Sequence, residues 1–257
     1  MGVNGVKYDP SSAEYFESTS TGENIIDWHV EARYIFSANF GNNGGHLNPF
    51  GEYHYHDVPA DYFADDLSID GSAHSPIVGY SADGFPMYYK YIYSDPEDNT
   101  SAIMEAASGF TLKTGTRPGD GVSAPDGDYT GLYYEDYEYF SANTVLDECN
   151  GRYGVTPEYP YGTYYYVLTD SYPYIPRCFK GTSVDNTFRV GPGPSCPESS
   201  AATDCAVAVA GCMAPFSTNY NANASVDDGS CSHSSTFETS ISFASQYTAS
   251  CFGDSDG

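Results

Sequence analysis

The chain has 257 residues, with nine Lys plus Arg against 35 Asp plus Glu and a formal net charge of −26 at pH 7. Contact with phosphates requires cations, so this balance argues against nucleic-acid binding and against an anionic membrane surface. No run of about 18 apolar residues occurs, so we expect no membrane insertion. The acidity fits solubility, and also divalent cation binding or a salty exterior.

Tyrosine dominates the aromatic content, with 26 tyrosines against one tryptophan. A tyrosine ring supplies apolar area while its hydroxyl needs a polar partner, which suits sheets with half-wet faces. We therefore predict a mainly β protein with antiparallel, sandwich-like sheets and few short helices. A small disulfide-rich C-terminal module is expected to follow it, because the length allows one large domain and such a module.

Residues 1–27 are polar and interrupted by turn-forming residues, and they predict a loose lead-in with at most one short strand. The opening residues lack the basic and apolar parts of a signal peptide, so the sequence is expected to begin after processing or to be a fragment. Residues 28–36 alternate apolar and polar side chains and predict a strand. His29 lies on the polar face of that strand, which favours a surface position over a ligand role.

Residues 44–56 contain three of the six histidines, His46, His54 and His56. If residues 52–58 form a strand, side chains alternate between its faces, so Glu52, His54 and His56 share one face. Histidines two apart on a strand lie about 6.6 Å apart at Cα, close enough for two imidazoles to converge on one metal ion. The turn-forming residues 48–51 can bring His46 back as a third nitrogen ligand.

Residues 74–93 predict two strands around Asp83-Gly84, which is a strong hairpin signal. His74 opens the first of these strands and is a candidate fourth imidazole; the alternative is an ordinary hydrogen-bonded histidine at a strand end. Imidazole suits zinc or copper, and imidazole with the Glu52 carboxylate also suits iron. A purely structural alternative has the histidines hydrogen-bonded to tyrosine hydroxyls inside the sheet.

Residues 101–109 predict the one short helix, and residues 114–131 predict a loop rich in Gly, Pro and Asp. Acids of this loop could hold calcium, but no calcium-loop spacing is met, so calcium is a weaker expectation than zinc or copper. The loop acids in question are Asp120, Asp126 and Asp128.

Asp147 and Glu148 are adjacent and point in different directions in any regular element, which makes them a poor acid/base pair. We expect one of them to be buried against Arg152 or Arg177. The second half of residues 156–170 predicts a strand, and no histidine occurs around residues 164–167, so this strand supplies no imidazole to the metal site.

Seven cysteines without a CxxC pair favour disulfides in an oxidising compartment over a zinc ribbon. Cys149 and Cys178 are the only cysteines in the main body, and a bridge between them would stabilise the fold by roughly 3 kcal/mol. The odd number leaves one thiol free or available to another chain. The remaining disulfide candidates lie near the C-terminus: Cys196, Cys205, Cys212 and Cys231.

The composition changes at the Gly-Pro-Gly-Pro of residues 191–194, where we place a domain boundary. The predicted organisation is a lead-in over residues 1–27, a domain over 28–194 and a Cys-rich tail over 195–257. Asn99 and Asn223 begin N-glycosylation sequons, so glycans are expected partners if the source cell attaches them.

Residues 211–231 predict a small disulfide-closed unit, in which Asn219, Asn221 and Asn223 only weakly match a calcium loop. Residues 237–247 predict a strand with no partner nearby in the sequence. Such a strand satisfies its backbone hydrogen bonds by joining the edge of a sheet in its own chain or in another subunit. The residues expected to mediate this assembly are Phe237, Ile241, Phe243, Tyr247 and Cys251.

Four blocks agree in order and spacing with one family: Gly45-His46 with residues 51–56, residues 74–86, residues 146–152 and residues 156–164. Over about residues 28–181 the chain resembles the YHYH domain family. The resemblance implies a secreted or surface protein and no assigned activity. Residues 211–231 are similar to a short repeat in the tails of surface proteins from aquatic bacteria and some algae, which implies an extracellular attachment segment.

Two functions follow as hypotheses. The first is a non-catalytic extracellular or cell-surface structural protein that self-associates through its tail into filaments or a surface layer. The alternative is a secreted metal-binding protein or metal-dependent enzyme of unknown substrate. No nucleophile elbow, phosphate loop or paired carboxylates occur, so the sequence indicates no class of reaction. It favours a non-enzyme over an enzyme.

Overall fold

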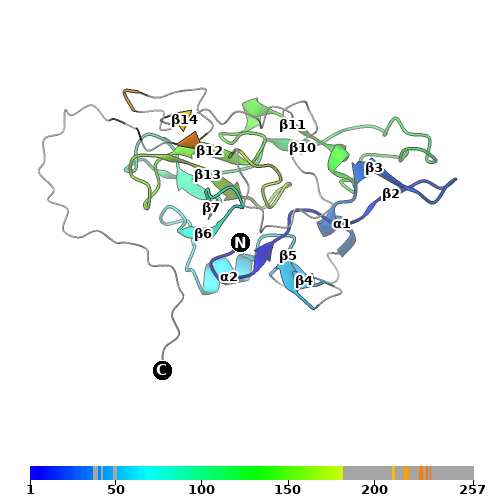
Figure 1. The fold of residues 1–257 in the computed structure, drawn as a ribbon, viewed down its shortest axis with the longest axis horizontal. Helices are drawn as coiled ribbons and strands as arrows, with labels where there is room; N and C mark the ends of the chain where they lie inside the picture. The colour runs from blue at the N-terminus through cyan, green and yellow to red at the C-terminus, as the bar shows by residue number, and fades with distance from the viewer. Residues whose placement is uncertain are drawn as a thin grey trace, which may run out of the picture.

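A computed structural model describes residues 1–36, 40–41, 43–48, 51–181, 210–211, 217–219, 226–227, 230 and 232. Short strands in antiparallel and mixed sheets make up most of the regular secondary structure of these residues, with few and short helices, which confirms the mainly β prediction (Figure 1). None of the helices in the described ranges has the length and apolarity needed to cross a bilayer.

The central sheet has four strands in the order β12 (Gly151–Gly154), β13 (Thr163–Leu168), β7 (Pro86–Tyr89) and β6 (Ile77–Tyr80). β6 and β7 form the predicted antiparallel hairpin, in which Gly84 takes a φ of +88° that favours glycine. β7 and β13 pair in parallel. Both strands are buried over nearly their whole length because side chains cover both faces of the sheet.

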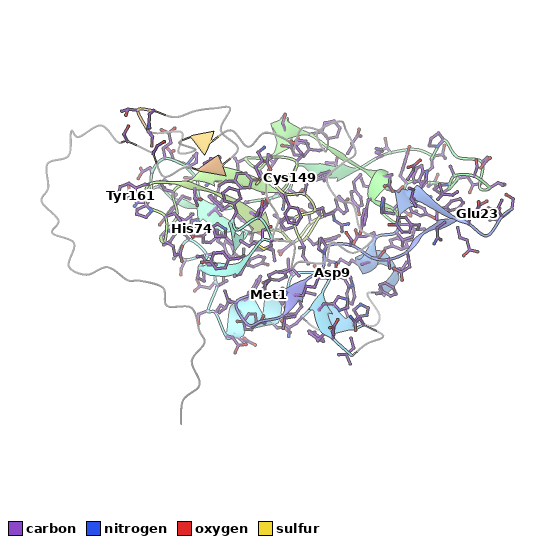
Figure 2. The ribbon with its side chains drawn as sticks, viewed as in Figure 1. Met1, Asp9, Glu23, His74, Cys149 and Tyr161 are labelled. Atoms are coloured by element: carbon purple, nitrogen blue, oxygen red, sulfur yellow. A yellow bond between two sulfur atoms is a disulfide. The ribbon has the colours of Figure 1, made fainter. Side chains whose placement is uncertain are left out.

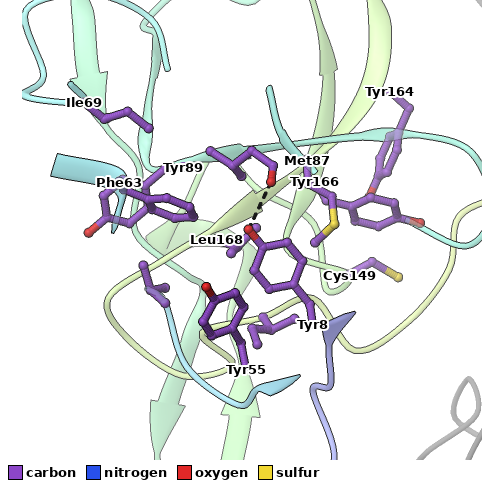
Figure 3. Close-up of a cluster of buried hydrophobic side chains, with 13 residues drawn as sticks. Tyr8, Tyr55, Phe63, Ile69, Met87, Tyr89, Cys149, Tyr164, Tyr166 and Leu168 are labelled. Atoms are coloured by element: carbon purple, nitrogen blue, oxygen red, sulfur yellow. Dashed lines mark hydrogen bonds between the residues drawn. The ribbon is translucent and has the colours of Figure 1, made fainter. Parts of the chain in front are cut away.

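Alternate residues of β13 enter two separate cores. Tyr164, Tyr166 and Leu168 belong to one cluster, while Tyr165 and Val167 belong to the other. Figure 3 shows the first cluster, which also receives Tyr8, Tyr55, Phe63 and Met87 from the N-terminal part of the chain. The strand period of two therefore decides which side of the sheet each tyrosine supports.

The first core joins the central sheet to a smaller one. In this second sheet β5 (Tyr53–Tyr55) lies between β1 (Lys7–Tyr8), to which it is parallel, and β4 (Gly45–Leu47), to which it is antiparallel. The short helix α2 (Ala60–Asp65) follows and places Phe63 in the core. Figure 1 shows α2, β4 and β5 together on one side of the central sheet.

Three further two-stranded sheets complete the main body, which is the part of the chain up to residue 181. They pair β2 (Tyr15–Glu17) with β3 (Asn24–His29), β8 (Tyr91–Tyr93) with β9 (Ile103–Glu105), and β10 (Phe110–Leu112) with β11 (Tyr137–Tyr139). The 3₁₀ turns η2 (Tyr134–Asp136) and η3 (Ser141–Asn143) flank β11. Residues 1–27, expected to be a loose lead-in, thus contain β1, β2 and part of β3.

Two sequence predictions of secondary structure are wrong. Residues 28–36 form the end of β3 and then α1 (Ala32–Phe36), where the Glu31 carboxylate accepts a hydrogen bond from the Arg33 backbone N–H and so satisfies a helix donor. Residues 101–109 contain β9 instead of a helix. Pairing with β8 satisfies the backbone of residues 103–105 and overrides their helix propensity.

Beyond residue 181 the structure describes β14 (Ala210–Gly211), which pairs in parallel with β15 (Val226–Asp227). The side chain of Asn219 donates to the Ser230 carbonyl at 2.7 Å and accepts from the Ser232 N–H at 2.8 Å. The other tail predictions lie outside the described residues: Cys196, Cys205, Cys212, Asn223, Cys231, Phe237, Ile241, Phe243, Tyr247 and Cys251.

A buried ion pair connects the two ends of the main body. Arg177 Nη2 donates to the Glu31 carboxylate at 2.6 Å, and the guanidinium lies 3.8 Å from the ring centroid of Tyr134. The expectation that Asp147 or Glu148 would pair with Arg177 or Arg152 is wrong. Asp147 instead accepts from the Tyr164 hydroxyl at 3.0 Å.

The predicted bridge between Cys149 and Cys178 is present and closes a separation of 29 residues. It attaches the segment that follows β13 to the loop before β12, beside the first core. Together with the Glu31–Arg177 pair, it holds the last described residues of the main body against the sheet.

Replacing both bridge cysteines by alanine should lower the free energy of unfolding by about 3–4 kcal/mol, because the unfolded chain regains the freedom of a long loop. Urea unfolding of the full chain measures this. A Ser141→Ala variant at an exposed position is the control and should change stability by less than about 0.5 kcal/mol. A double-alanine variant within about 1 kcal/mol of wild type would contradict a stabilising bridge.

Arg177→Met should lower the free energy of unfolding by about 3–5 kcal/mol, because the Glu31 carboxylate is left buried without its cation. Adding Glu31→Gln should restore part of that loss. A double-mutant cycle by urea unfolding measures the coupling. Strictly additive losses would show that the two side chains do not stabilise each other.

Candidate metal centre

The three histidines of the N-terminal block converge on one face of the β4–β5 hairpin. His46 on β4 lies directly opposite His54 on β5, and His56 follows two residues later. The ring centroids are 4.8 Å apart for His46 and His54, 5.1 Å for His46 and His56, and 4.6 Å for His54 and His56. The strand alternation predicted for this block therefore places all three imidazoles together.

Local residues explain the tight hairpin. The Asn48 side chain accepts from the Glu52 N–H and donates to the Glu52 carboxylate, each at 2.9 Å, and so closes the turn. At its other end, a Cβ on Gly45 would lie 2.5 Å from the His54 carbonyl. Glycine is therefore required where β4 approaches β5.

Backbone carbonyls fix the orientation of two of the rings. His54 Nδ1 lies 3.2 Å from the Glu52 carbonyl, and His56 Nδ1 lies 2.7 Å from the Asp9 carbonyl. A carbonyl oxygen only accepts hydrogen bonds, so each Nδ1 carries the proton and donates it. In the neutral imidazole the lone pair is then on Nε2, the nitrogen available to a metal.

The Nε2 atoms of His54 and His56 face each other at 2.9 Å. Two nitrogen lone pairs at this distance repel unless a proton or a cation lies between them. A shared proton requires one ring to be charged. Burial, and to a smaller extent the nearby His54 ring, lowers the pKa of His56 to about 4. A metal cation held between the two nitrogens would remove this repulsion without charging either ring.

Two of the three imidazoles are buried, and two phenylalanine rings lie beside the cluster. His54 and His56 are 8% and 5% exposed, whereas His46 is only partly buried. The Phe36 ring lies 5.3 Å from that of His46, and the Phe40 ring lies 5.8 Å from that of His56. Burial also lowers the pKa of His46, so this ring too is kept neutral and able to bind a metal.

The distances within the cluster suit a transition metal after a small adjustment. One nitrogen from each ring lies within 4.8 Å of the other two. Tetrahedral zinc with nitrogen ligands at about 2.0–2.1 Å places those nitrogens about 3.4 Å apart. To reach this spacing, the His54 and His56 Nε2 atoms, now 2.9 Å apart, would separate by about 0.5 Å, and the more exposed His46 ring would rotate toward them.

The other predicted ligands lie elsewhere. Figure 2 labels His74 well away from Asp9, whose carbonyl binds His56. His74 is 6% exposed, donates from Nδ1 to the Ser75 carbonyl at 2.8 Å, and packs 4.7 Å from the Tyr93 ring. The Glu52 carboxylate accepts a hydrogen bond from the Asn48 side chain.

The remaining polar candidates make their own local contacts. His29, expected at the surface, is half-buried; its Nδ1 lies 3.1 Å from the Glu135 carboxylate. In the Asp-rich loop, Asp120 accepts backbone N–H groups of its own turn, while Asp126 and Asp128 are exposed. Asn99 is exposed and accessible to modification.

Sequence reasoning missed the Asp9 carbonyl and the Phe36 and Phe40 rings. The carbonyl has no sequence signal, since any residue type carries one and only the pairing of β1 with β5 brings it to His56. The two phenylalanines lie on or just after α1, which the alternating pattern had predicted as a strand.

Residues 1–181 match the family model described as YHYH protein. The chain belongs to the YHYH protein family. The YHYH domain includes β1, in agreement with the contribution of that strand to the histidine cluster. Comparison with curated proteins and with solved structures gave no match.

In the metal-free YHYH domain, His56 should titrate near pH 4, well below the ordinary value of 6.5. The unfolded chain then binds the proton more tightly than the folded chain does, so stability is unaffected above about pH 6.5 and falls as the pH drops toward 4. Imidazole NMR and urea unfolding at several pH values measure both effects. A His56→Gln variant should lose this part of the pH dependence. Titration of His56 at or above 6.5 would contradict the burial effect.

Proposed function

We propose that this YHYH domain binds a divalent transition-metal ion through His46, His54 and His56. The single observation that carries the proposal is the 2.9 Å approach of two Nε2 atoms whose rings both direct Nδ1 at a carbonyl. Hydrogen bonds of this kind orient metal-binding histidines and raise their basicity. The Glu52 and Asp9 carbonyls would serve as these outer partners.

The ligand set favours zinc or copper. Imidazole nitrogens suit these ions, while calcium prefers oxygen ligands and the cluster contains only nitrogen atoms. Iron sites of the two-histidine type need a carboxylate, and the Glu52 side chain is hydrogen-bonded to Asn48 instead. Zinc or copper is therefore the proposed cofactor.

Three protein nitrogens leave a coordination position for water or another ligand. Structural zinc sites usually use four protein ligands, whereas three ligands and an open position are typical of zinc sites that bind substrate. His46, the most exposed of the three, lies on the side where such a ligand would enter. We assign no reaction to this position.

An extracellular or cell-surface location is part of the proposal. The Cys149–Cys178 bridge supports an oxidising compartment. The exposed Asn99 suits a glycan. Assembly into filaments or a surface layer stays a prediction, because the terminal residues expected to mediate it lie outside the described residues.

The purified chain of 257 residues, dialysed against zinc or copper, should retain about one equivalent of metal per chain. A His54→Ala, His56→Ala double variant should lose it, because both buried nitrogens are removed. Elemental analysis measures the metal. At a metal concentration of about 100 Kd the wild type should also gain about 2.7 kcal/mol of stability, and the double variant should gain none.

His29→Gln is the matched control, since it removes an imidazole that contacts Glu135 outside the cluster. This variant should keep the metal content and the metal-dependent stabilisation of the wild type. Equal metal in the wild type and in the double variant would contradict the site.

A further inference from the structure

A cavity of about 510 Å³ adjoins the histidine cluster. Phe40 belongs to both, because this residue lines the cavity and its ring stacks 5.8 Å from the His56 ring. The backbone is shared as well: the Gly44 carbonyl accepts from the His56 N–H at 3.0 Å, and Asp57 follows His56 in the chain. The main lining residues are Arg33, Phe40, Gly44, Asp57, Tyr89 and Asp170.

The acidic groups of this cavity already have partners. Asp57 Oδ1 accepts from the Val58 N–H at 2.7 Å and from Arg33 Nη1 at 3.1 Å. Asp170 accepts from the Tyr89 hydroxyl at 2.5 Å and from Lys90 Nζ at 2.6 Å. A cationic ligand would therefore compete with Arg33 and Lys90 for both carboxylates.

Arg33 has hydrogen-bonding capacity to spare. Its Nη1 is directed at Asp57, whereas its Nε and Nη2 have no hydrogen-bond partner among the described residues. The guanidinium is held in place over the Tyr174 ring, 4.3 Å from its centroid, and the side chain remains 40% exposed. A guanidinium with its Nε and Nη2 donors to offer is well suited to a carboxylate.

We infer that this cavity binds a small monocarboxylic acid with an apolar or aromatic body. Its carboxylate pairs with Arg33, and its body lies against Phe40 and Tyr89. A volume of about 510 Å³ is within the usual range for small-molecule sites. A single negative charge fits better than two, because Asp57 and Asp170 line the same space.

The position of this acid beside a metal rests on the proposed function, whereas its pairing with Arg33 does not. With metal bound at the cluster, Phe40 would separate the ligand body from the His56 ring. The acid is therefore assigned to the cavity itself, and its binding does not require the metal.

Benzoate, benzamide and benzylamine form a test series that shares a phenyl ring and differs in charge. Saturation-transfer NMR and calorimetry with the full-length protein, zinc-treated and metal-free, should show saturable benzoate binding. Benzamide and benzylamine should each bind about tenfold more weakly or not at all, a difference of about 1.4 kcal/mol. Equal binding of all three, or tighter binding of benzylamine, would overturn the inference without any variant.

Arg33→Gln should weaken benzoate binding about tenfold and bring it close to that of benzamide. Lys7→Gln, which removes an exposed cation paired with Asp9, should leave it unchanged. Unchanged benzoate affinity in Arg33→Gln would overturn the inference. Metal analysis of the zinc-treated samples separates the two proposals. A protein that takes up zinc but does not bind benzoate contradicts this inference alone. A protein that takes up no zinc but binds benzoate through Arg33 contradicts only the proposed function.

Discussion

The pairing of β1 with β5 is the constraint on which the histidine cluster depends. Lys7 and Tyr8 lie beside His54 and Tyr55 in parallel register, and the Asp9 N–H continues the ladder to the Tyr55 carbonyl at 2.7 Å. The Asp9 carbonyl is thereby placed 2.7 Å from His56 Nδ1. Without this acceptor the His56 ring could turn over, and its Nε2 atom would no longer face that of His54.

The same short strands also bind the cluster to the hydrophobic core. Tyr8 is 7% exposed, and its hydroxyl donates to the Val78 carbonyl at 3.0 Å. A dashed line at the Tyr8 hydroxyl marks this hydrogen bond in Figure 3. Tyr55, on the opposite face of β5 from the two histidines, packs in the same core. The alternation of tyrosine and histidine thus gives one strand two roles, in packing and in presenting imidazoles. Because core packing fixes the position of β5, it also fixes the positions of the His54 and His56 imidazoles.

Much of the cluster follows from local sequence, and the rest does not. A period of two predicts that His54 and His56 share a face, and the Asn48 turn brings back His46. By contrast, contacts between residues far apart in the chain decide where α1 forms and where His74 lies, and local patterns do not reveal these contacts. Glu31 illustrates this, because its carboxylate joins an α1 donor and Arg177, 146 residues away. His74 has the local pattern of a ligand, yet tertiary packing places it among tyrosine rings.

Anomalous diffraction from a zinc- or copper-loaded crystal tests the metal centre most directly. The geometry predicts a strong peak about 2.0–2.2 Å from the Nε2 atoms of His54 and His56, with a His46 nitrogen completing the site. It also predicts that Nδ1 of His56 keeps its hydrogen bond to the Asp9 carbonyl. A loaded crystal whose only metal peaks lie away from these three rings would contradict a metal at this cluster.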